Sequence, residues 1–290
     1  MSWRVVVISS NSKLDYQMGF LVVRKEDITK IHLSEINTVI IESTAVSLTT
    51  ALISELTKHK IKVIFCDEKR NPSSELIAYY GSHDTSKKIR NQISWDTDIK
   101  TSVWTEIVTE KIRKQMELLA DMQKPEEIML KQYIEELEFG DMTNREGHAA
   151  KVYFNALFGK DFSRSNDNIL NSALNYGYSI ILSSFTREIT INGYMTQLGL
   201  FHDNMFNPFN LASDLMEPFR ILVDRKVVKN HSSCFEHEEK MQLVNILNET
   251  VTINGKSEHV INAIKIYTKS IFDALEEKDV SLIRFYNNEL

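Results

Sequence analysis

Residues 82–95 read SHDTSKKIRNQISW, and the pattern of the chain changes at this stretch. On its N-terminal side, short runs rich in β-branched residues are separated by polar turns, which predicts β-strands. We expect these strands at residues 4–9, 19–24, 38–42, 61–66 and 75–80. One segment of this region, residues 46–59, has its apolar residues at helical spacing instead.

On the C-terminal side, apolar residues recur with the period of a helix. The expected helices cover residues 97–122, 126–139, 143–159, 167–190, 236–249 and 257–276. Pro125 suits the first position of the second helix, and Gly140 is expected to end it. Thr143 and Glu146 have the spacing of a capping box at the start of the third helix.

The two regions predict an α+β protein of two domains. Residues 1–90 are expected to form a small β-rich domain, similar to a β-sandwich with one helix, and residues 91–290 a larger all-helical domain. The boundary is expected within residues 82–98. In the helical domain, Asn254-Gly255 has the sequence of a β-hairpin turn.

The composition is that of an ordinary globular protein, with 290 residues, 42% of them hydrophobic and 26% charged. No apolar run is long enough to cross a bilayer, and the start MSWRVVVISSNSK has no signal-peptide core. Cys66 and Cys234 lie far apart and fit no metal-binding spacing. We therefore expect a reduced, cytoplasmic protein without membrane contact.

The net charge of −6 is unevenly distributed along the chain. Residues 1–95 hold 13 Lys and Arg against 10 Asp and Glu, whereas residues 96–145 hold 7 against 12. Residues 146–230 are balanced, but some of their acids are candidate site residues. If a metal ion and a DNA backbone neutralise those acids, the remaining Arg and Lys form a locally positive surface. The charge therefore neither supports nor excludes DNA binding.

The clearest chemistry lies in residues 198–226, LGLFHDNMFNPFNLASDLMEPFRILVDRK. His202 precedes a helix that carries Asp214 and Glu217, which project from nearly the same face at i and i+3. Carboxylates with one imidazole suit a divalent cation such as Mg2+ or Mn2+. Because Pro218 disfavours helical geometry at Glu217, we expect the helix to be kinked or interrupted there.

Each of these candidates also has a structural interpretation. Glu146 can be the third residue of a capping box. Asp214 and Glu217 can be an exposed acidic pair that the helix dipole favours. His202 can be a histidine of the core. These alternatives stay open on the residues alone.

Other catalytic patterns are weak or absent. His231, Cys234 and His237 lack the second pair of ligands that a zinc site needs. No Gly-rich phosphate loop and no Ser or Cys nucleophile motif occurs in the sequence. Catalysis by a nucleophilic side chain is therefore not expected.

Basic and aromatic residues surround the candidate site in sequence. Arg220, Arg225, Lys226 and Lys229 follow the acidic pair, where they either offset the helix dipole or hold a phosphate backbone. Tyrosines at three helical positions either belong to the core or stack on unpaired bases. They are Tyr153, Tyr176 and Tyr178.

Several of these segments resemble one known family. REGHAAKVYF (145–154), GLFHDN (199–204) and NPFNLASDLMEPFR (207–220) are similar to the catalytic motifs of the Cas-one family, the CRISPR-associated spacer-acquisition integrases. VSLTTALISEL, IKVIFCDE and KKIRNQISW also resemble that family, specifically its type II branch. The resemblance spans nearly the whole chain. It implies a β-rich N-terminal domain, which we expect to dimerise, and an all-helical catalytic domain.

The resemblance also implies a catalytic site. The metal ligands of the family fall on Glu146, His202 and Glu217, and its additional catalytic acid falls on Asp214. Some members have Asp where Glu217 stands, which changes the reach of the ligand but not its type. The cofactor is expected to be Mg2+ or Mn2+. We expect DNA contacts from Arg145, Tyr153, Tyr176, Arg220, Arg225 and Lys226.

The partners that the resemblance implies are double-stranded DNA and other proteins. The DNA is the prespacer and the CRISPR repeat. The chain is expected to form a homodimer, and a dimer of the Cas-two protein is expected to bridge two such homodimers. Other type II adaptation and effector proteins are further expected partners.

Three functions remain to be distinguished. The first is an integrase that joins the 3′-hydroxyl ends of short foreign DNA into the CRISPR repeat by metal-dependent transesterification. The second is a metal-dependent endonuclease that uses water at the same site. The third is a DNA-bridging scaffold without catalysis, in which the acids only cap helices. The family resemblance favours the first.

Overall fold

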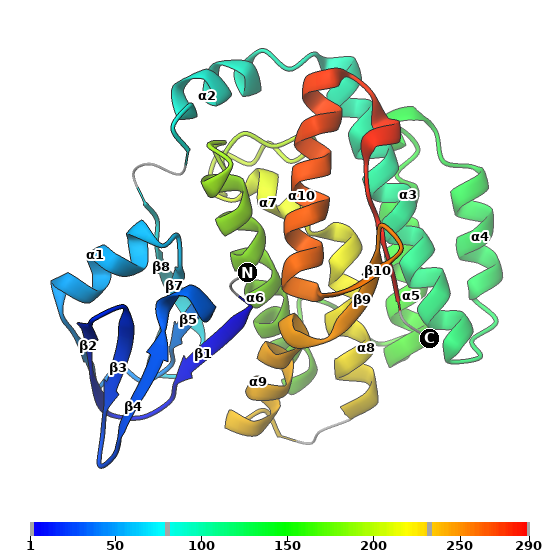
Figure 1. The fold of residues 1–290 in the computed structure, drawn as a ribbon. Coiled ribbons are helices and arrows are strands. Elements are labelled where there is room, and N and C mark those ends of the chain that lie inside the picture. The colour runs from blue at the N-terminus through cyan, green and yellow to red at the C-terminus, as the bar shows by residue number, and fades with distance from the viewer. Residues whose placement is uncertain (1–2, 79–81, 231–233, 289–290) are drawn as a thin grey trace.

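The computed structural model describes residues 3–78, 82–230 and 234–288. A β-rich N-terminal part lies beside a larger, mainly helical C-terminal part (Figure 1). The expected α+β fold class is therefore confirmed. The division at residue 90 stays a prediction, and that position lies inside helix α2 (Thr85–Ile93).

Two four-stranded sheets form the N-terminal part. The first sheet has the order β1-β5-β7-β8, in which β8 alone runs antiparallel to its neighbour. Its strands are β1 (Arg4–Ile8), β5 (Ile36–Ile41), β7 (Lys62–Cys66) and β8 (Pro72–Leu76). The second sheet has the order β4-β3-β2-β6. Its strands are β4 (Ile28–His32), β3 (Phe20–Arg24), β2 (Ser12–Gln17) and β6 (Val46–Leu48).

The two sheets share an apolar core, as expected for a sandwich. Leu14 and Leu21 enter it from the second sheet and Val39 from the first. Helix α1 (Thr50–Lys58) adds Leu52. These side chains are fully buried, so the pairing of the sheets is set by apolar packing.

The expected strands at residues 4–9, 19–24, 38–42 and 61–66 are confirmed to within two residues. The helix expected at 46–59 is shorter, because Val46–Leu48 pairs with β2 as a strand. Thr49 then caps α1 by accepting the N–H of Leu52 at 3.3 Å.

Other strands departed from expectation. Strands β2 and β4 were not expected, because their sequences SKLDYQ and ITKIH carry few apolar residues. Strands β2 and β4 form because each pairs with one side of β3, and the local sequence pattern does not show this pairing. The strand expected at 75–80 corresponds to β8, which ends at Leu76. Residues 79 and 80 of that expectation lie outside the described residues.

Helix α6 (Ile169–Ile191) contacts the helices of residues 210–215, 220–230, 237–244 and 260–277, and it also contacts β7 and β8. The long helix α3 (Thr97–Asp121) confirms the expectation for residues 97–122. Within the described residues no helix is long and apolar enough to span a membrane. The other helices are α4 (Glu127–Glu135), α5 (Arg145–Phe158), α7 (Asn210–Leu215), α8 (Arg220–Asn230), α9 (His237–Val244) and α10 (Val260–Glu277).

Two expected limits of helix α4 are wrong. The helix begins at Glu127, and Pro125 precedes it, with its carbonyl accepting the N–H of Ile128 at 3.2 Å. The helix ends at Glu135 instead of Gly140. Gly140 lies in a 3-10 turn with φ of 72°, a conformation that favours glycine.

The expectation that the C-terminal part is all helical is wrong in one region. A three-stranded sheet of order β10-β9-β11 lies there, made of β9 (Thr250–Ile253), β10 (Lys256–His259) and β11 (Tyr286–Asn288). The expected hairpin turn at Asn254-Gly255 is confirmed, with φ of 53° and 70°. The helix expected from residue 257 therefore begins only at Val260.

The first sheet of the N-terminal part is packed on both faces. Val39 and Val63 face the core shared by the two sheets. Ile40 and Ile64 belong to the core of the helical part. Parallel strands covered on both faces have nearly continuous apolar sequences, and INTVII of β5 is buried throughout.

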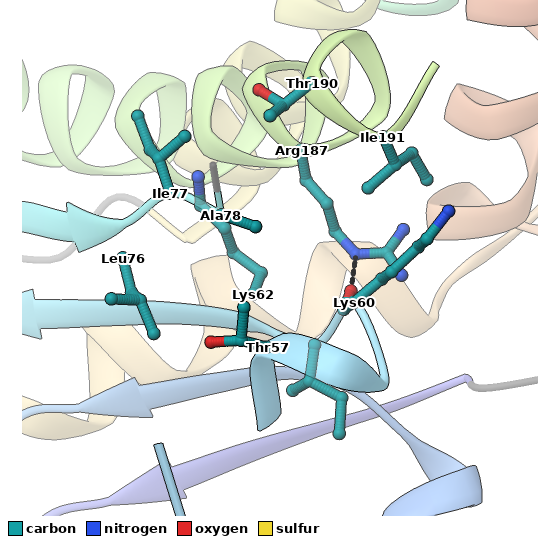
Figure 2. Close-up of a pocket in the computed structure, with 10 residues that line it drawn as sticks. Thr57, Lys60, Lys62, Leu76, Ile77, Ala78, Arg187, Thr190 and Ile191 are labelled. Atoms are coloured by element: carbon teal, nitrogen blue, oxygen red, sulfur yellow. Dashed lines mark hydrogen bonds between the residues drawn. The ribbon is translucent and has the colours of Figure 1, made fainter. Parts of the chain in front are cut away.

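Polar contacts complete this seam between the sheet and α6. Arg187 of α6 donates from Nε to the carbonyl oxygen of Lys60 at 3.0 Å (Figure 2). Ser183 donates its hydroxyl to Glu75 at 3.1 Å, and Glu75 pairs with Lys62 at 2.5 Å. The cavity that Figure 2 draws holds only about 40 Å³, so the seam is closely packed.

Candidate active site

Two of the three expected metal ligands meet around one buried ammonium. Lys111 of α3 lies with Nζ 2.5 Å from Oε2 of Glu217 and is also paired with Oε1 of Glu146. Arg220 donates from Nε to Oε1 of Glu217 at 3.0 Å. The structure thus brings together two carboxylates from distant parts of the sequence.

Glu146 is free to face this site because other groups cap its helix. Asn144 is the N-cap of α5 and accepts the N–H of Gly147 at 3.3 Å. The carboxylate of Asp141 accepts the N–H groups of Arg145 and Glu146 at 2.6 and 3.0 Å. The expected capping box of Thr143 and Glu146 is therefore wrong. The structural interpretation of Glu146 as a cap falls with it.

Glu217 lies at the break that Pro218 causes. Helix α7 ends at Leu215, the 3-10 turn η3 (Glu217–Phe219) follows, and α8 starts at Arg220. The expected interruption is confirmed. Burial alone would raise the pKa of the Glu217 carboxyl, but Arg220 and Lys111 hold it down at about 2. Glu217 is therefore a buried carboxylate that stays ionised.

The charge of Lys111 is the counterpart of this arrangement. Burial lowers the pKa of the Lys111 ammonium, but Glu217 and Glu146 more than offset that effect and raise it. The ammonium therefore stays protonated among the two acids. It provides the positive charge that the buried Glu217 carboxylate shares with the partly exposed Glu146.

Asp214 organises the loop that carries His202. It is fully buried and accepts the backbone N–H groups of Leu200, Phe201 and His202 at 2.6, 3.1 and 3.2 Å. Its Oδ1 also lies 2.5 Å from Nδ1 of the His202 ring. This hydrogen bond raises the pKa of His202. It also leaves Nε2 as the ring nitrogen open to a ligand.

Close packing fixes the same loop. A Cβ on Gly199 would lie 2.2 Å from the carbonyl oxygen of His202, so only glycine fits there. The ring of Trp104 stacks on Phe201 at 4.5 Å and meets the His202 ring edge-on at 5.7 Å. The alternative interpretation of Asp214, as an exposed acid that the helix dipole favours, is therefore wrong. Asp214 holds the orientation of His202.

A cavity of about 270 Å³ opens beside the carboxylate pair. Among the described residues, no three His, Cys, Asp or Glu side chains converge closely enough to hold an ion. Lys111 lies between Glu146 and Glu217, and His202 is not part of the cavity wall. The two carboxylates nevertheless share one cation, which is the donor chemistry that Mg2+ or Mn2+ takes.

The residues expected to contact DNA lie in different environments. Arg220 lines the cavity. Arg145, Arg225 and Lys226 are ion-paired with acids 2.6 to 2.9 Å away. The rings of two expected stacking residues are buried in the core and cannot reach a base from where they lie. They are Tyr153 and Tyr176.

Sequence reasoning missed three residues that line the cavity, namely Lys111, Arg164 and Asp224. Lys111 could have been noticed as a lysine four positions after the buried Ile107, on the apolar side of α3. Asp224 is fully buried and accepts hydroxyl hydrogen bonds from Tyr153, at 2.9 Å, and from Tyr178. Arg164 lies in a connecting segment, where no periodic pattern marks it.

Comparison with solved structures shows the class of fold. The chain has a TM-score of 0.76 and 19% identity to a casposase bound to an integration product, covering 97% of this chain and 92% of that one. It has a TM-score of 0.74 and 20% identity to a chain of a Cas6-RT-Cas1–Cas2 complex, covering 97% of this chain and 36% of that chain. The chain thus shares its fold with the casposase and with this chain of the Cas6-RT-Cas1–Cas2 complex.

Sequence comparison identifies the family. The profile described as CRISPR associated protein Cas1 matches residues 5–239. The chain is 30% identical over 292 residues to the CRISPR-associated endonuclease Cas1 of Neisseria meningitidis, covering 98% of this chain and 96% of the relative. The protein belongs to the CRISPR-associated Cas1 family. Assignment to the type II branch stays a prediction.

Proposed function

We propose that this protein is a DNA integrase of CRISPR adaptation, acting in the cytoplasm with Mg2+ or Mn2+. The observation that carries the proposal is the pair of Glu146 and Glu217, held around a single positive charge beside a cavity. Two comparisons support it. The relative from Neisseria meningitidis is named an endonuclease, and the casposase of similar fold is described as bound to an integration product.

Glu146 and Glu217 would hold the ion with their oxygens, and His202 would hold it through Nε2. When bound, the ion acts as a Lewis acid that offsets the charge developing on a phosphate group. Asp214 keeps the His202 ring in one orientation and one tautomer. Arg220 fixes the Glu217 carboxylate by its hydrogen bond.

The proposed reaction is a transesterification. The 3′-hydroxyl oxygen of the incoming DNA forms a new bond to a phosphorus atom of the repeat, while the bond from that phosphorus to the 3′ oxygen of the repeat strand breaks. The number of phosphodiester bonds is unchanged, so no nucleotide hydrolysis is needed. The protein has mainly to position the two strands and stabilise charge. This agrees with the lack of a nucleophile motif in the sequence.

The second candidate is hydrolysis by water at the same site, which the name of the relative favours. A supercoiled target that contains a repeat separates the two reactions. Integration of a short duplex with free 3′ hydroxyls yields a branched product. Hydrolysis yields only nicked or linear DNA. We expect branched product that depends on Mn2+ or Mg2+.

The site assignment is tested by variants in the same assay. We expect His202→Ala and Glu217→Gln to lower the rate of joining by at least about a hundredfold, as for other groups that stabilise a transition state. Glu135→Gln, at an exposed position on α4, is the matched control and should join normally. Unimpaired joining by a folded His202→Ala or Glu217→Gln protein would refute the assignment.

We further propose a homodimer formed through the β-rich part, with two homodimers bridged by a dimer of Cas2. The support is the similar fold of a chain from a Cas6-RT-Cas1–Cas2 complex. Light scattering on the purified protein should give twice the mass of one chain. Adding Cas2 should give a single larger species, and a monomer that ignores Cas2 would contradict the proposal.

A further inference from the structure

The side chain of Arg164 lines the active-site cavity, and its guanidinium donates hydrogen bonds to neutral amide groups. Its Nη1 donates to the amide oxygen of Asn171 and its Nη2 to that of Asn175, both at 2.6 Å. Within the described part of the chain it forms no ion pair with an acid. The other two cations of the cavity wall, Lys111 and Arg220, are both paired with carboxylates.

The Arg164 guanidinium is also fixed in orientation. It lies 5.9 Å from the centre of the Phe154 ring and 5.3 Å from that of the Tyr178 ring. Asn171 is itself buried and anchored, since its amide donates to the carbonyl oxygens of Ser163 and Asn166 at 2.8 Å. A guanidinium held in this way loses little conformational entropy when it binds a further acceptor.

Among the described residues, Arg164 forms no ion pair with Asp224, a buried acid of the same cavity wall. Asp224 is close enough for the Arg164 charge to act on its pKa. However, its two carboxylate oxygens accept the hydroxyl groups of Tyr153 and Tyr178. The positive charge of Arg164 is therefore available to an anion that enters the cavity, in which Glu146 and Glu217 also lie.

We propose that Arg164 binds a DNA phosphate in this cavity and so positions the strand at the carboxylate pair. The inference rests on the proposed function, because the ligand it names is the substrate of that site. A guanidinium offers paired donors that match the oxygens of a phosphate. Because a phosphate carries no base identity, the contact is independent of sequence.

The first test is DNA binding without chemistry, measured in Ca2+ at several salt concentrations. We expect Arg164→Gln to weaken binding to a duplex about tenfold at low salt and to reduce the slope of log K against log salt by about one. Arg164→Lys should keep the slope, since it keeps the charge. Arg284→Gln is the matched control. Its guanidinium also donates to neutral oxygens, those of Ser281 and Ile283, but it is not part of the cavity wall.

A second variant separates charge from fold. Asn175→Asp leaves Arg164 in place but gives it a carboxylate partner at an exposed position, so the fold should be retained. We expect it to weaken binding to a similar extent in the native chain, and to have a smaller effect in the Arg164→Gln background. An equal effect in both backgrounds would show that the new charge acts without Arg164.

The decisive experiment replaces single phosphates of the target by neutral methylphosphonates, at the scissile position and at its two neighbours. The native protein should bind DNA with a methylphosphonate at one of these positions more weakly than unmodified DNA. The Arg164→Gln variant should bind that modified DNA and unmodified DNA with nearly equal affinity. Full additivity at all three positions would overturn the proposal. If the native protein binds but does not join DNA, the proposed function fails and the binding tests still decide the role of Arg164.

Discussion

At the scale of single residues, buried charges are compensated one by one. Glu217 has Lys111 and Arg220 as partners, and Asp214 has three backbone N–H groups and an imidazole. A buried carboxylate without such partners would take up a proton or destabilise the fold. Asp224 receives direct hydrogen bonds from hydroxyl groups only, so its charge is compensated less than those of Glu217 and Asp214.

The stability of the protein should depend on pH through Asp224. Burial raises the pKa of its carboxyl from 3.8 to about 6, against the hydrogen bonds of Tyr178 and Tyr153, which lower it. Between these two values the folded state binds more protons than the unfolded chain, so the free energy of unfolding falls as pH rises. Relative to the native protein, Asp224→Asn should therefore gain roughly 2 to 3 kcal/mol between about pH 4 and pH 7.

Urea unfolding at a series of pH values measures this difference. Asp203→Asn, at an exposed position, is the matched control for the loss of one carboxylate. An Asp224→Asn difference that does not change with pH would mean that Asp224 keeps an ordinary pKa in the fold.

At the scale of elements, helices α6 and α8 set the shape of the site by approaching closely. A Cβ on Gly177 of α6 would lie 2.4 Å from Cγ1 of Val223 on α8. Helix α8 carries Arg220 and Asp224, so its distance from α6 fixes the cavity wall.

Gly177→Ala should lower the free energy of unfolding by about 2 kcal/mol, because the extra methyl group overpacks this contact. Val223→Ala removes the opposing methyl groups and costs about 1 kcal/mol by itself. In the double variant the clash is relieved, so the loss should be smaller than the sum of the two. Chemical denaturation of the three variants measures the coupling, and strict additivity would show that the helices separate instead.

The elements that could be predicted are those whose pattern is local. β-Branched runs indicated β1, β3, β5 and β7, and helical periodicity indicated α3 and α6. The polar strands β2 and β4 could not be predicted, since pairing with β3 is what orders them. The break before α8 was predictable because Pro218 acts on its immediate neighbours.

At the scale of the whole molecule, the β-rich and helical parts share one of the sheets. Ile40 and Ile64 face the helices while Val39 and Val63 face the second sheet. At the edge of this seam, Lys62 pairs with Glu75, and Glu75 accepts a hydrogen bond from Ser183 of α6. Neither part can therefore be removed without exposing apolar surface.

Lys62 and Glu75 test this seam as a pair. Lys62→Met alone should lower the free energy of unfolding by about 3 kcal/mol, because it leaves a poorly solvated Glu75 without its cation. The double variant Lys62→Met, Glu75→Leu should recover most of this loss, since no unpaired charge remains. Thermal and urea unfolding measure both, and a double variant that is as unstable as the single one would contradict the explanation.

Tertiary folding also decides which residues of the candidate site could be predicted from the sequence. His202, Asp214 and Glu217 share a short segment and were found together, and family resemblance added Glu146 as a ligand. Lys111 was missed because its contacts are made by tertiary folding, 35 residues from Glu146 along the chain. Arg164 was missed for a similar reason, because only the folded structure places it in the wall of the cavity.

Under the proposed function, the Lys111 ammonium between Glu146 and Glu217 would determine how the protein responds to the concentration of divalent ions. Lys111 offsets part of the negative charge of the two acids before any ion binds, so an ion that enters would have to displace the ammonium from at least one carboxylate. Occupancy then depends on competition between the ion and a tethered ammonium, whose effective concentration is fixed by the fold. Under the proposed function, the protein would stay folded when divalent ions are scarce, and joining would increase gradually as the ion displaces Lys111 from the two acids.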